Sequence, residues 1–328
     1  MLAEQPVVRF RAVPLQPQFH QLCDESAELL RAEAAAGLRA QPAQASPKHF
    51  YDELGSRLFD AITALPEYYP TRIEAEIFRR QGAAIAAELA GSDVLVDLGA
   101  GNCSKADYLL GPLQPQRYVA IDISTSHLRS SLWALQQRHP DVEMIGVGTD
   151  FTHSLELPGG THLARAVFFY AGSSIGNWAP EQARRWLSGL RQHRGARLVV
   201  GVDLVKPIGI LEAAYDDPLG VTAAFNRNLL RNLNRLLSAN FDLRRWRHVA
   251  FFSPLKSRIE MHLESATTQR VCWRGGEREF VAGERIHTEN SYKYTIEGFE
   301  TLLREAGFGG VRCFTDPGRW FGVFTAHA

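Results

Sequence analysis

Short apolar runs alternate with amphipathic segments through the centre of the chain. Apolar runs typical of buried strands begin at 94, 118, 143, 166 and 196. Apolar residues recur at helical spacing between them and before the first run, over 72–89, 104–110, 128–138 and 180–193. Strands that alternate with helices in this way predict a doubly wound α/β fold, with a parallel sheet covered on both faces.

This alternation stops between 205 and 290. Helical spacing continues over 208–215 and 221–237, and the strings RIEMHLES and TQRVCW then indicate a small antiparallel unit. A helix over 295–308 and a terminal strand pair follow, and the DPG turn within that pair predicts a hairpin. The middle block is therefore interpreted as an insertion into the sheet domain.

Two amphipathic segments precede the sheet domain, at 25–40 and 48–65. We expect them to join the insertion in a second lobe over the cofactor crevice. The predicted division assigns 73–206 and 292–328 to the sheet domain, and 15–72 and 207–291 to a substrate-binding lobe.

The most informative segment is VLVDLGAGNCSK at 94–105, where a predicted strand opens into a loop. Gly99 and Gly101 let a ligand approach the backbone closely, and a following helix N-terminus adds unpaired N–H groups. The dinucleotide fingerprint needs a third glycine where this chain has Ser104. Asp97 instead completes the D-x-G-x-G pattern of S-adenosylmethionine loops, with an ordinary strand-to-helix turn as the alternative.

Carboxylates after the next two predicted strands support such a cofactor. Asp122 lies where an acidic side chain can accept hydrogen bonds from both ribose hydroxyls, or can cap a helix. Asp150 and Phe151 offer a carboxylate and an apolar face to an adenine, or Asp150 forms only an Asx turn. Lys105 follows the loop and can meet the methionine carboxylate or lie in solvent.

The composition limits the classes of protein that fit. The 328 residues are 45% hydrophobic, which suits one large domain or two closely packed ones. A net charge of +0 gives no footprint for nucleic acid or membrane. The start MLAEQPVVRFRAVP has no signal core, and neither the four cysteines nor the eleven histidines have metal-ligand spacing. We expect a metal-free, cytoplasmic monomer that acts on a small molecule.

Several strings in the chain form a recognisable set. They are YDELGSRLFDAITALPEYYPTR, DLGAGNCSK, GSSIGN, GVDLVKP, AAYDDPLGVTAAFNRNLLRNLN, RIEMHL and HTENSYKY. Together they resemble the histidine-specific N-alpha-methyltransferases of ergothioneine biosynthesis, from about residue 48 to the C-terminus. The resemblance implies a Rossmann-like class I methyltransferase fold. It also implies that S-adenosylmethionine gives three methyl groups in succession to the α-amino group of L-histidine, which makes hercynine without a metal.

The resemblance implies roles for three residues near the reacting amine. Asn177 and Tyr215 are expected to hold the substrate carboxylate, and Tyr68 to lie against the amino acid near its amino or ring end. These three form the expected catalytic group. Each also has a simpler interpretation, in which Asn177 forms a turn, Tyr215 ends a helix and Tyr68 packs a turn onto the core.

Three further residues are implied to recognise the side chain. Glu289 and Ser291 are expected to bind the imidazole, and Met261 to shape its pocket. The alternatives are a solvated ion pair of Glu289 with Lys293, four residues on, and a purely core position for Met261.

The remaining implied residues contact the methyl donor. They are Gly99, Lys105, Asp122, Asp150 and Phe151, and Asp97 and Gly101 complete the loop. Asn102 and Cys103 depart from the small hydroxyl residues more usual in this loop, so the contact to the amino group of the donor is expected to differ.

Three hypotheses follow. The chain is a histidine N-methyltransferase, a methyltransferase of the same family for another aromatic amino acid such as tryptophan, or a non-catalytic module that only binds the cofactor. Glu289, Ser291 and Met261 together favour histidine. The intact loop and its two following carboxylates speak against a degenerate module.

Overall fold

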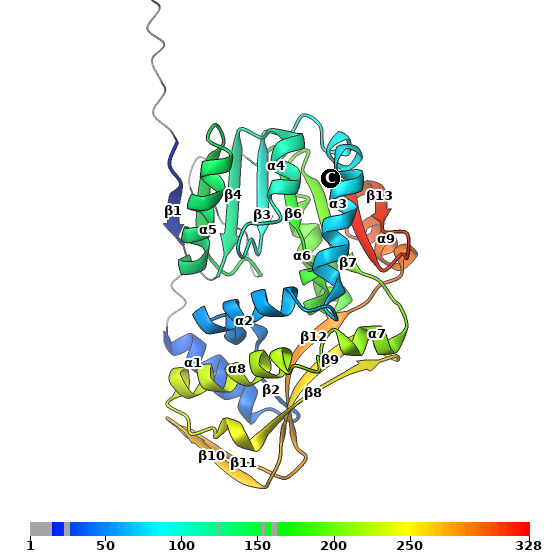
Figure 1. Cartoon of the computed structure of the whole chain (residues 1–328). Coiled ribbons are helices and arrows are strands. Elements are labelled where there is room, and N and C mark those ends of the chain that lie inside the picture. The colour runs from blue at the N-terminus through cyan, green and yellow to red at the C-terminus, as the bar shows by residue number, and fades with distance from the viewer. Residues whose placement is uncertain (1–14, 23–26, 124, 153–154, 156, 159–162) are drawn as a thin grey trace, which may run out of the picture.

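The computed structural model describes residues 15–22, 27–123, 125–152, 155, 157–158 and 163–328. An eight-stranded sheet with the strand order β1-β5-β4-β3-β6-β7-β14-β13 forms the upper part of the molecule in Figure 1. Its strands are β1 (Gln18–Gln21), β3 (Val94–Leu98), β4 (Arg117–Asp122), β5 (Glu143–Gly148), β6 (Val167–Tyr170), β7 (Arg197–Asp203), β13 (Gly309–Thr315) and β14 (Phe321–His327). Neighbours from β1 to β7 are parallel, whereas β14 runs antiparallel to β7 and β13.

The predicted doubly wound sheet and its closing hairpin are therefore confirmed. One segment departs from the predicted division, because residues 18–21 were expected in the second lobe but form the edge strand β1 beside β5. This segment, QFHQ, contains a single apolar residue, so hydrophobic periodicity does not reveal it. The start at 1–14 and Cys23 lie outside the described residues.

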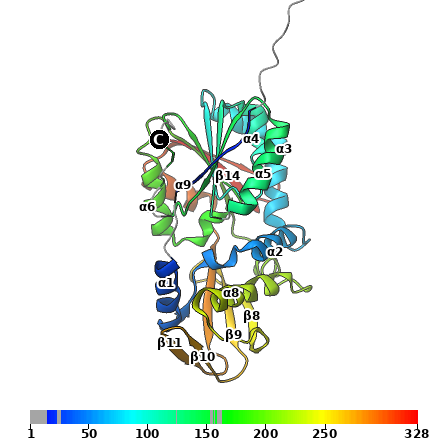
Figure 2. The same ribbon diagram turned by 90° about the vertical axis from the view of Figure 1, so that its left-hand side faces the viewer.

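Helices cover both faces of the large sheet, as Figure 2 shows. On one face lie α3 (Tyr69–Glu88), α4 (Asp107–Leu113) and α5 (Thr125–Arg138), and on the other lie α6 (Pro180–Leu190) and α9 (Ile296–Glu305). Ile85, Leu109 and Leu132 belong to the first core, and Leu187 and Phe299 belong to the second. The strands between them are apolar on both faces, as strands buried on two sides require.

A second, smaller unit lies below the large sheet in both views. It contains a four-stranded sheet of order β2-β12-β9-β8 and a separate β10–β11 hairpin. The strands are β2 (Ala43–Gln44), β8 (Trp246–Ser253), β9 (Arg258–Ser265), β10 (Gln269–Trp273), β11 (Gly276–Phe280) and β12 (Arg285–Tyr292). The helices are α1 (Ala27–Arg39), α2 (Glu53–Thr63), α7 (Ile208–Ala213) and α8 (Val221–Leu237). The N-terminal helices and the insertion share one hydrophobic core, which includes Leu38, Phe50, Leu229 and Trp246.

The two sheets meet where β7 and β12 end. Leu204 and Tyr294 form an isolated parallel bridge just beyond those ends, and the Tyr294 amide donates to the carbonyl oxygen of Asp203. The loop after β3 also faces the second unit, because Asn102 Nδ2 donates to Asp60 Oδ1 of α2 over 3.3 Å. The carboxyl ends of the parallel strands, where open α/β sheets bind ligands, therefore lie at this junction.

Candidate active site

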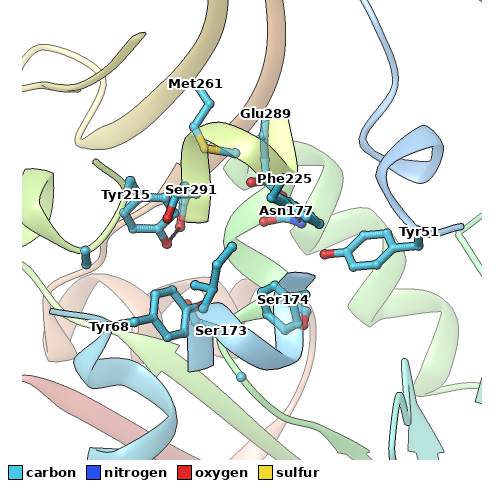
Figure 3. Close-up of a pocket in the computed structure, with 15 residues that line it drawn as sticks. Tyr51, Tyr68, Ser173, Ser174, Asn177, Tyr215, Phe225, Met261, Glu289 and Ser291 are labelled. Atoms are coloured by element: carbon cyan, nitrogen blue, oxygen red, sulfur yellow. Dashed lines mark hydrogen bonds between the residues drawn. The ribbon is translucent and has the colours of Figure 1, made fainter. Parts of the chain in front are cut away.

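A pocket at the junction is lined by both units. Its walls come from the segment before α3, from the 3₁₀ helix η2 (Ser174–Asn177), from the residues after α7, and from β9 and β12. All six residues predicted to bind the substrate line it: Tyr68, Asn177, Tyr215, Met261, Glu289 and Ser291. Figure 3 shows their side chains around one space, with Tyr215 beside Ser291 and Glu289 beside Asn177. Positions from 68 to 291 in the chain thus converge on one site.

The register of β9 and β12 explains how three of these residues meet. Met261 pairs with Glu289 and Ile259 pairs with Ser291 in the antiparallel ladder. Because alternate residues of a strand lie on the same face, Glu289 and Ser291 reach the pocket together, with Met261 beside Glu289. The ladder is irregular between His287 and Glu289, a feature that re-aims side chains near functional sites.

Glu289 is the buried carboxyl group of the pocket. The residue is 8% exposed, and Asn177 Nδ2 donates to its Oε1 over 3.2 Å. Burial raises the pKa of Glu289 to about 7, while the charge of Lys293 and the Asn177 hydrogen bond act in the opposite direction. Glu289 therefore gains or loses its negative charge near pH 7, and it is a hydrogen-bond acceptor as a carboxylate.

Tyr215 and Ser291 form a second polar part of the pocket. The Tyr215 hydroxyl and Ser291 Oγ are 2.7 Å apart, and Lys293 Nζ donates to them over 3.0 Å and 2.7 Å respectively. The same ammonium lies 2.7 Å from Asp203 Oδ2. Lys293 is thus buried between Asp203 and the pocket hydroxyls, and the solvated ion pair with Glu289 that the sequence left open does not form.

Tyr68 and Met261 are both core and lining residues. Tyr68 is 8% exposed, and its ring meets those of Tyr215 and Phe59 edge-on with centroids 6.2 Å and 6.1 Å away. Burial raises the pKa of Tyr68 well above its ordinary value, so its phenol stays a hydrogen-bond donor. Met261 is 2% exposed. The packing and the pocket interpretations of these residues are therefore compatible.

Sequence reasoning missed several lining residues. Tyr51 and Phe225 contact one another edge-on at 5.8 Å between ring centroids, and Ser173 lies in a tight turn with a φ of 61°. Tyr51 and Phe225 stand inside the strings YDELGS and FNRN, so the family resemblance could have identified them. Ser173, in the turn after β6, likewise stands inside the string GSSIGN, although nothing in that string predicts its positive φ.

The loop after β3 has the backbone that its glycines predict. Gly99 and Gly101 have φ values of 70° and 53°, which glycine adopts without strain. Asp97 is 3% exposed, and its Oδ2 accepts a 2.7 Å hydrogen bond from the Tyr118 hydroxyl. Burial raises the pKa of Asp97 to about 7, although this hydrogen bond and Lys105 lower it. This hydrogen bond ties the end of β3, where the loop begins, to β4.

Asp122, the last residue of β4, lies beside this loop, and Asp150 follows β5. The Gly101 amide donates to Asp122 Oδ2 over 2.8 Å. Asp150 Oδ1 accepts from the Thr152 amide and hydroxyl over 2.9 Å and 2.6 Å, which is the Asx turn that the sequence left open. Phe151, next in the chain, is 9% exposed.

Lys105 connects the loop to the substrate pocket. Its ammonium lies 2.7 Å from Oε2 of Glu74, a residue of α3 that is 1% exposed. Glu74 Oε1 accepts the amide of Gly172 over 2.8 Å, and Gly172 lines the pocket. The predicted contact of Lys105 with the methionine carboxylate stays a prediction.

These groups fit the methyl donor predicted from the sequence. A side-chain carbon built at Gly101 would meet no atom within 4 Å, and one at Gly99 would meet only the Phe151 ring at 3.9 Å, so the loop borders open space. Asp122 stands beside that space through its bond to Gly101, and Asp150 precedes the Phe151 ring that faces Gly99. Their contacts with a ribose and an adenine edge stay predictions. The residues around the loop thus offer hydrogen-bond acceptors, backbone amides and an apolar ring to a ligand.

The described part of the chain bears on metals, on paired histidines and on membrane helices. No group of three or more histidine, cysteine, aspartate or glutamate side chains in that part of the chain is arranged to hold a metal ion. His262 and His287, distant in sequence, meet edge-on across β9 and β12 with ring centroids 5.1 Å apart. Among the described helices, none combines the length and the apolarity needed to cross a membrane.

The sequence is similar to those of known methyltransferases. Residues 30–328 match the family described as histidine-specific methyltransferase, SAM-dependent. The chain is 43% identical over 312 residues to a histidine N-alpha-methyltransferase of Mycolicibacterium smegmatis, covering 92% of this chain and 96% of the relative. It is 41% identical over 308 residues to a histidine N-alpha-methyltransferase of Mycobacterium tuberculosis, covering 90% and 94%. A 4-dimethylallyltryptophan N-methyltransferase of Claviceps purpurea is 26% identical over 313 residues, covering 86% and 90%.

The family match spans most of the chain, and the two mycobacterial relatives are matched over nearly their whole length. They confirm the resemblance inferred from the motifs, the class I methyltransferase fold and S-adenosylmethionine as the methyl donor. The chain therefore belongs to the family of histidine-specific, S-adenosylmethionine-dependent methyltransferases.

Proposed function

We propose that this chain transfers three methyl groups in succession from S-adenosylmethionine to the α-amino group of L-histidine, giving hercynine for ergothioneine biosynthesis. The observation that carries the proposal is one buried pocket next to the donor loop, with an acceptor at Glu289 and hydroxyls at Ser291 and Tyr215. The names and the high identity of the two mycobacterial relatives support it.

The polar groups of the pocket match the two nitrogens of a neutral imidazole, one a donor and one an acceptor. Glu289 as a carboxylate accepts the ring N–H, and Ser291 donates to the bare nitrogen. Met261 and Phe225 supply apolar surface for the ring. An indole has no bare ring nitrogen, so it would leave the buried Ser291 hydroxyl without an acceptor. Unpaired buried polar groups discriminate strongly between substrates.

Asn177 and Tyr68 are proposed to orient the amino acid end of the substrate. Asn177 Nδ2 donates one N–H to Glu289, and its second N–H can donate to the substrate carboxylate. Burial holds the pKa values of Tyr68 and Tyr51 well above the ordinary value, so both phenols stay neutral beside the amine. The reacting nitrogen is therefore surrounded by neutral hydroxyl groups.

Positioning is the main task of the chain in this reaction. The methyl donor supplies an electrophilic methyl group on its sulfonium. The pocket residues hold a neutral amine in line with that group, at the distance of about 3 to 3.5 Å that favours attack. Burial of the pocket excludes water and favours the uncharged amine, which is the nucleophilic form.

We also propose that the chain acts on the free amino acid as a cytoplasmic monomer and without nucleic acid. The balance of 36 basic and 36 acidic residues supports the last point. Size-exclusion chromatography with light scattering, over a range of concentrations, tests the monomer. A mass that rises to that of a dimer would contradict it.

The substrate is tested by incubating the chain with S-adenosylmethionine and one amino acid at a time, with products read by mass spectrometry. We expect monomethyl, dimethyl and trimethyl histidine to appear in succession, and no product from tryptophan. Glu289→Ala is the matched control, because it should lose histidine turnover while it still binds S-adenosylhomocysteine. Turnover of tryptophan but not histidine would overturn the proposed substrate, and binding of the donor without any turnover would overturn catalysis.

A further inference from the structure

A buried ion cluster lies behind the pocket hydroxyls. It consists of Asp203, Lys206, Lys293 and Tyr69, and the side chains of its three charged members are 0–1% exposed. Burial alone would raise the pKa of Asp203, but Lys293 and Lys206 hold it below its ordinary value. One carboxylate therefore faces two lysine side chains. Burial lowers the pKa of Lys206 to about 8 and the charge of Asp316 acts against this, whereas Lys293 lies on the pocket side of Asp203.

The ammonium of Lys293 has no spare hydrogen for a ligand. A lysine has three N–H donors and no acceptor. In the structure these reach Asp203 Oδ2 at 2.7 Å, Ser291 Oγ at 2.7 Å and the Tyr215 hydroxyl at 3.0 Å. The backbone of Lys293 is fixed as well, because its amide donates to the carbonyl of Ser257. Lys293 therefore acts on a substrate through its two hydroxyl partners.

A count of hydroxyl protons shows what Lys293 does to those partners. Tyr215 and Ser291 each accept from Lys293 and each have a single O–H. They also lie 2.7 Å apart, so one of them donates to the other. One O–H remains, and both oxygens already accept, so that proton is free to point into the pocket. Lys293 thus makes this end of the pocket a hydrogen-bond donor.

We infer that Lys293, held by Asp203, is a positioning residue that orients the hydroxyls of Ser291 and Tyr215 as donors toward the substrate. The inference rests on the proposed function and adds a residue to the determinants of its specificity. A donor end backed by the Lys293 ammonium favours a bare imidazole nitrogen or a carboxylate, both of which accept hydrogen bonds. It disfavours an imidazolium ring, which has two N–H donors and a positive charge.

Lys206 provides a matched comparison within the same cluster. Its ammonium lies 2.5 Å from Asp203 Oδ1, 2.5 Å from the Leu204 carbonyl oxygen and 2.8 Å from the Tyr69 hydroxyl. The Lys206 side chain is 1% exposed against 0% for Lys293, and it shares the same carboxylate, but its N–H groups reach neither Ser291 nor Tyr215. A purely structural role of the cluster predicts similar effects from both lysines.

The test is a pair of double-mutant cycles on the full chain with Lys293→Met or Lys206→Met, each alone and combined with Ser291→Ala. We expect Lys293→Met to raise the KM for histidine about tenfold in the wild-type background and by less than about threefold in the Ser291→Ala background. The effect of Lys206→Met should be the same in both backgrounds. Binding of S-adenosylhomocysteine should change little in all variants, because the donor loop is untouched.

Equal effects of Lys293→Met in both backgrounds, or the same coupling for Lys206→Met, would overturn the inference. If Lys293→Met unfolds, Lys293→Gln takes its place in the same cycle. Failure of the unmodified chain to methylate histidine would overturn the proposed function alone. The cycles are then measured with the amino acid that is methylated. Equal effects of Lys293→Met in both backgrounds, or the same coupling for Lys206→Met, would again overturn the inference.

Discussion

Single residues of the pocket owe their effect to buried polar atoms with fixed partners. Glu289 accepts a hydrogen bond from Asn177. Ser291 and Tyr215 are hydrogen-bonded to one another and have one O–H between them that can donate to a ligand. Because these groups lie out of water, a substrate that does not complete their hydrogen bonds carries the cost of an unpaired group, about 1–3 kcal/mol for each. Discrimination therefore depends on hydrogen-bond pattern more than on the size of the ring.

The first prediction concerns the wall made by Glu289 and its ladder partner Met261. Glu289→Ala combined with Met261→Val removes the acceptor and shortens the neighbouring side chain. We expect kcat/KM for histidine to fall at least about 100-fold, while the Kd of S-adenosylhomocysteine changes less than about threefold. Steady-state kinetics and calorimetry measure the two quantities. Unchanged histidine turnover would show that the imidazole binds elsewhere.

The second prediction concerns pH. Burial raises the pKa of Glu289 to about 7, so the group takes up a proton as the pH falls through that value and loses the negative charge that accepts the imidazole N–H. The KM for histidine should therefore rise as the pH is lowered from about 8 to 6. Glu289→Gln is the control, because it shares every ionisation of the substrate but lacks this one. Parallel pH profiles of the two proteins would contradict the prediction.

At the scale of elements, α8 has an unusual packing face. Asparagine is a weak helix former, yet α8 buries Asn226, Asn228 and Asn232. Asn228 Nδ2 donates to Asp52 Oδ1, the N-cap of α2, over 2.8 Å, and Asn232 Nδ2 donates to the His49 carbonyl over 2.7 Å. These contacts hold the segment that contains Tyr51 against the pocket.

The third prediction follows from that contact. Asn232→Ala leaves the His49 carbonyl without its side-chain partner, so the free energy of unfolding should fall by about 1–3 kcal/mol. The KM for histidine should rise as well, because Tyr51 lies two residues further along the chain. Arg231 is an exposed neighbour on the same helix and approaches Asn228 and Asp52 only at 3.5 Å and 3.9 Å, so Arg231→Ala should stay within about 0.5 kcal/mol of the parent. Urea unfolding measures both, and equal losses would contradict this role.

Most elements could be predicted from the sequence because their burial gives a periodic signal. The helix predicted over 221–237 matches α8, and the strand predicted to end at Asp122 matches β4. The edge strand β1 could not be predicted, because an edge strand with polar side chains has no such period. The polar face of α8 also escapes periodicity, since its partners are backbone and side-chain atoms of residues far away in the chain.

At the scale of the whole molecule, the site depends on how the two sheets join. Motif resemblance identified six lining residues, because each stands in a distinctive string. Asp203 and Lys293 also stand in such strings, GVDLVKP and HTENSYKY, but nothing local shows that they touch. Their contact is made by the bridge between Leu204 and Tyr294, which joins β7 to β12 across the two units. No pattern within either segment encodes that pairing.

The junction also links the two ligand sites. Lys105 follows the donor loop and pairs with Glu74, and Glu74 holds the amide of Gly172 in the wall of the substrate pocket. We therefore expect a ligand that orders the donor loop to fix part of the substrate pocket through these three residues. When the first ligand has ordered these residues, the second ligand binds without that loss of conformational entropy. Each ligand should therefore increase the affinity for the other.

The fourth prediction is that S-adenosylhomocysteine lowers the Kd of histidine at least about fivefold, and that histidine lowers the Kd of S-adenosylhomocysteine by the same factor, as linkage requires. Glu74→Gln keeps an acceptor for Gly172 but loses the ion pair with Lys105, so it should reduce this factor while each ligand still binds alone. Glu76→Gln, which alters a partly exposed pair with Arg80 on the same helix, should leave it unchanged. Titration calorimetry of each ligand with and without the other measures the coupling, and equal Kd values would show that the Lys105–Glu74–Gly172 connection transmits nothing.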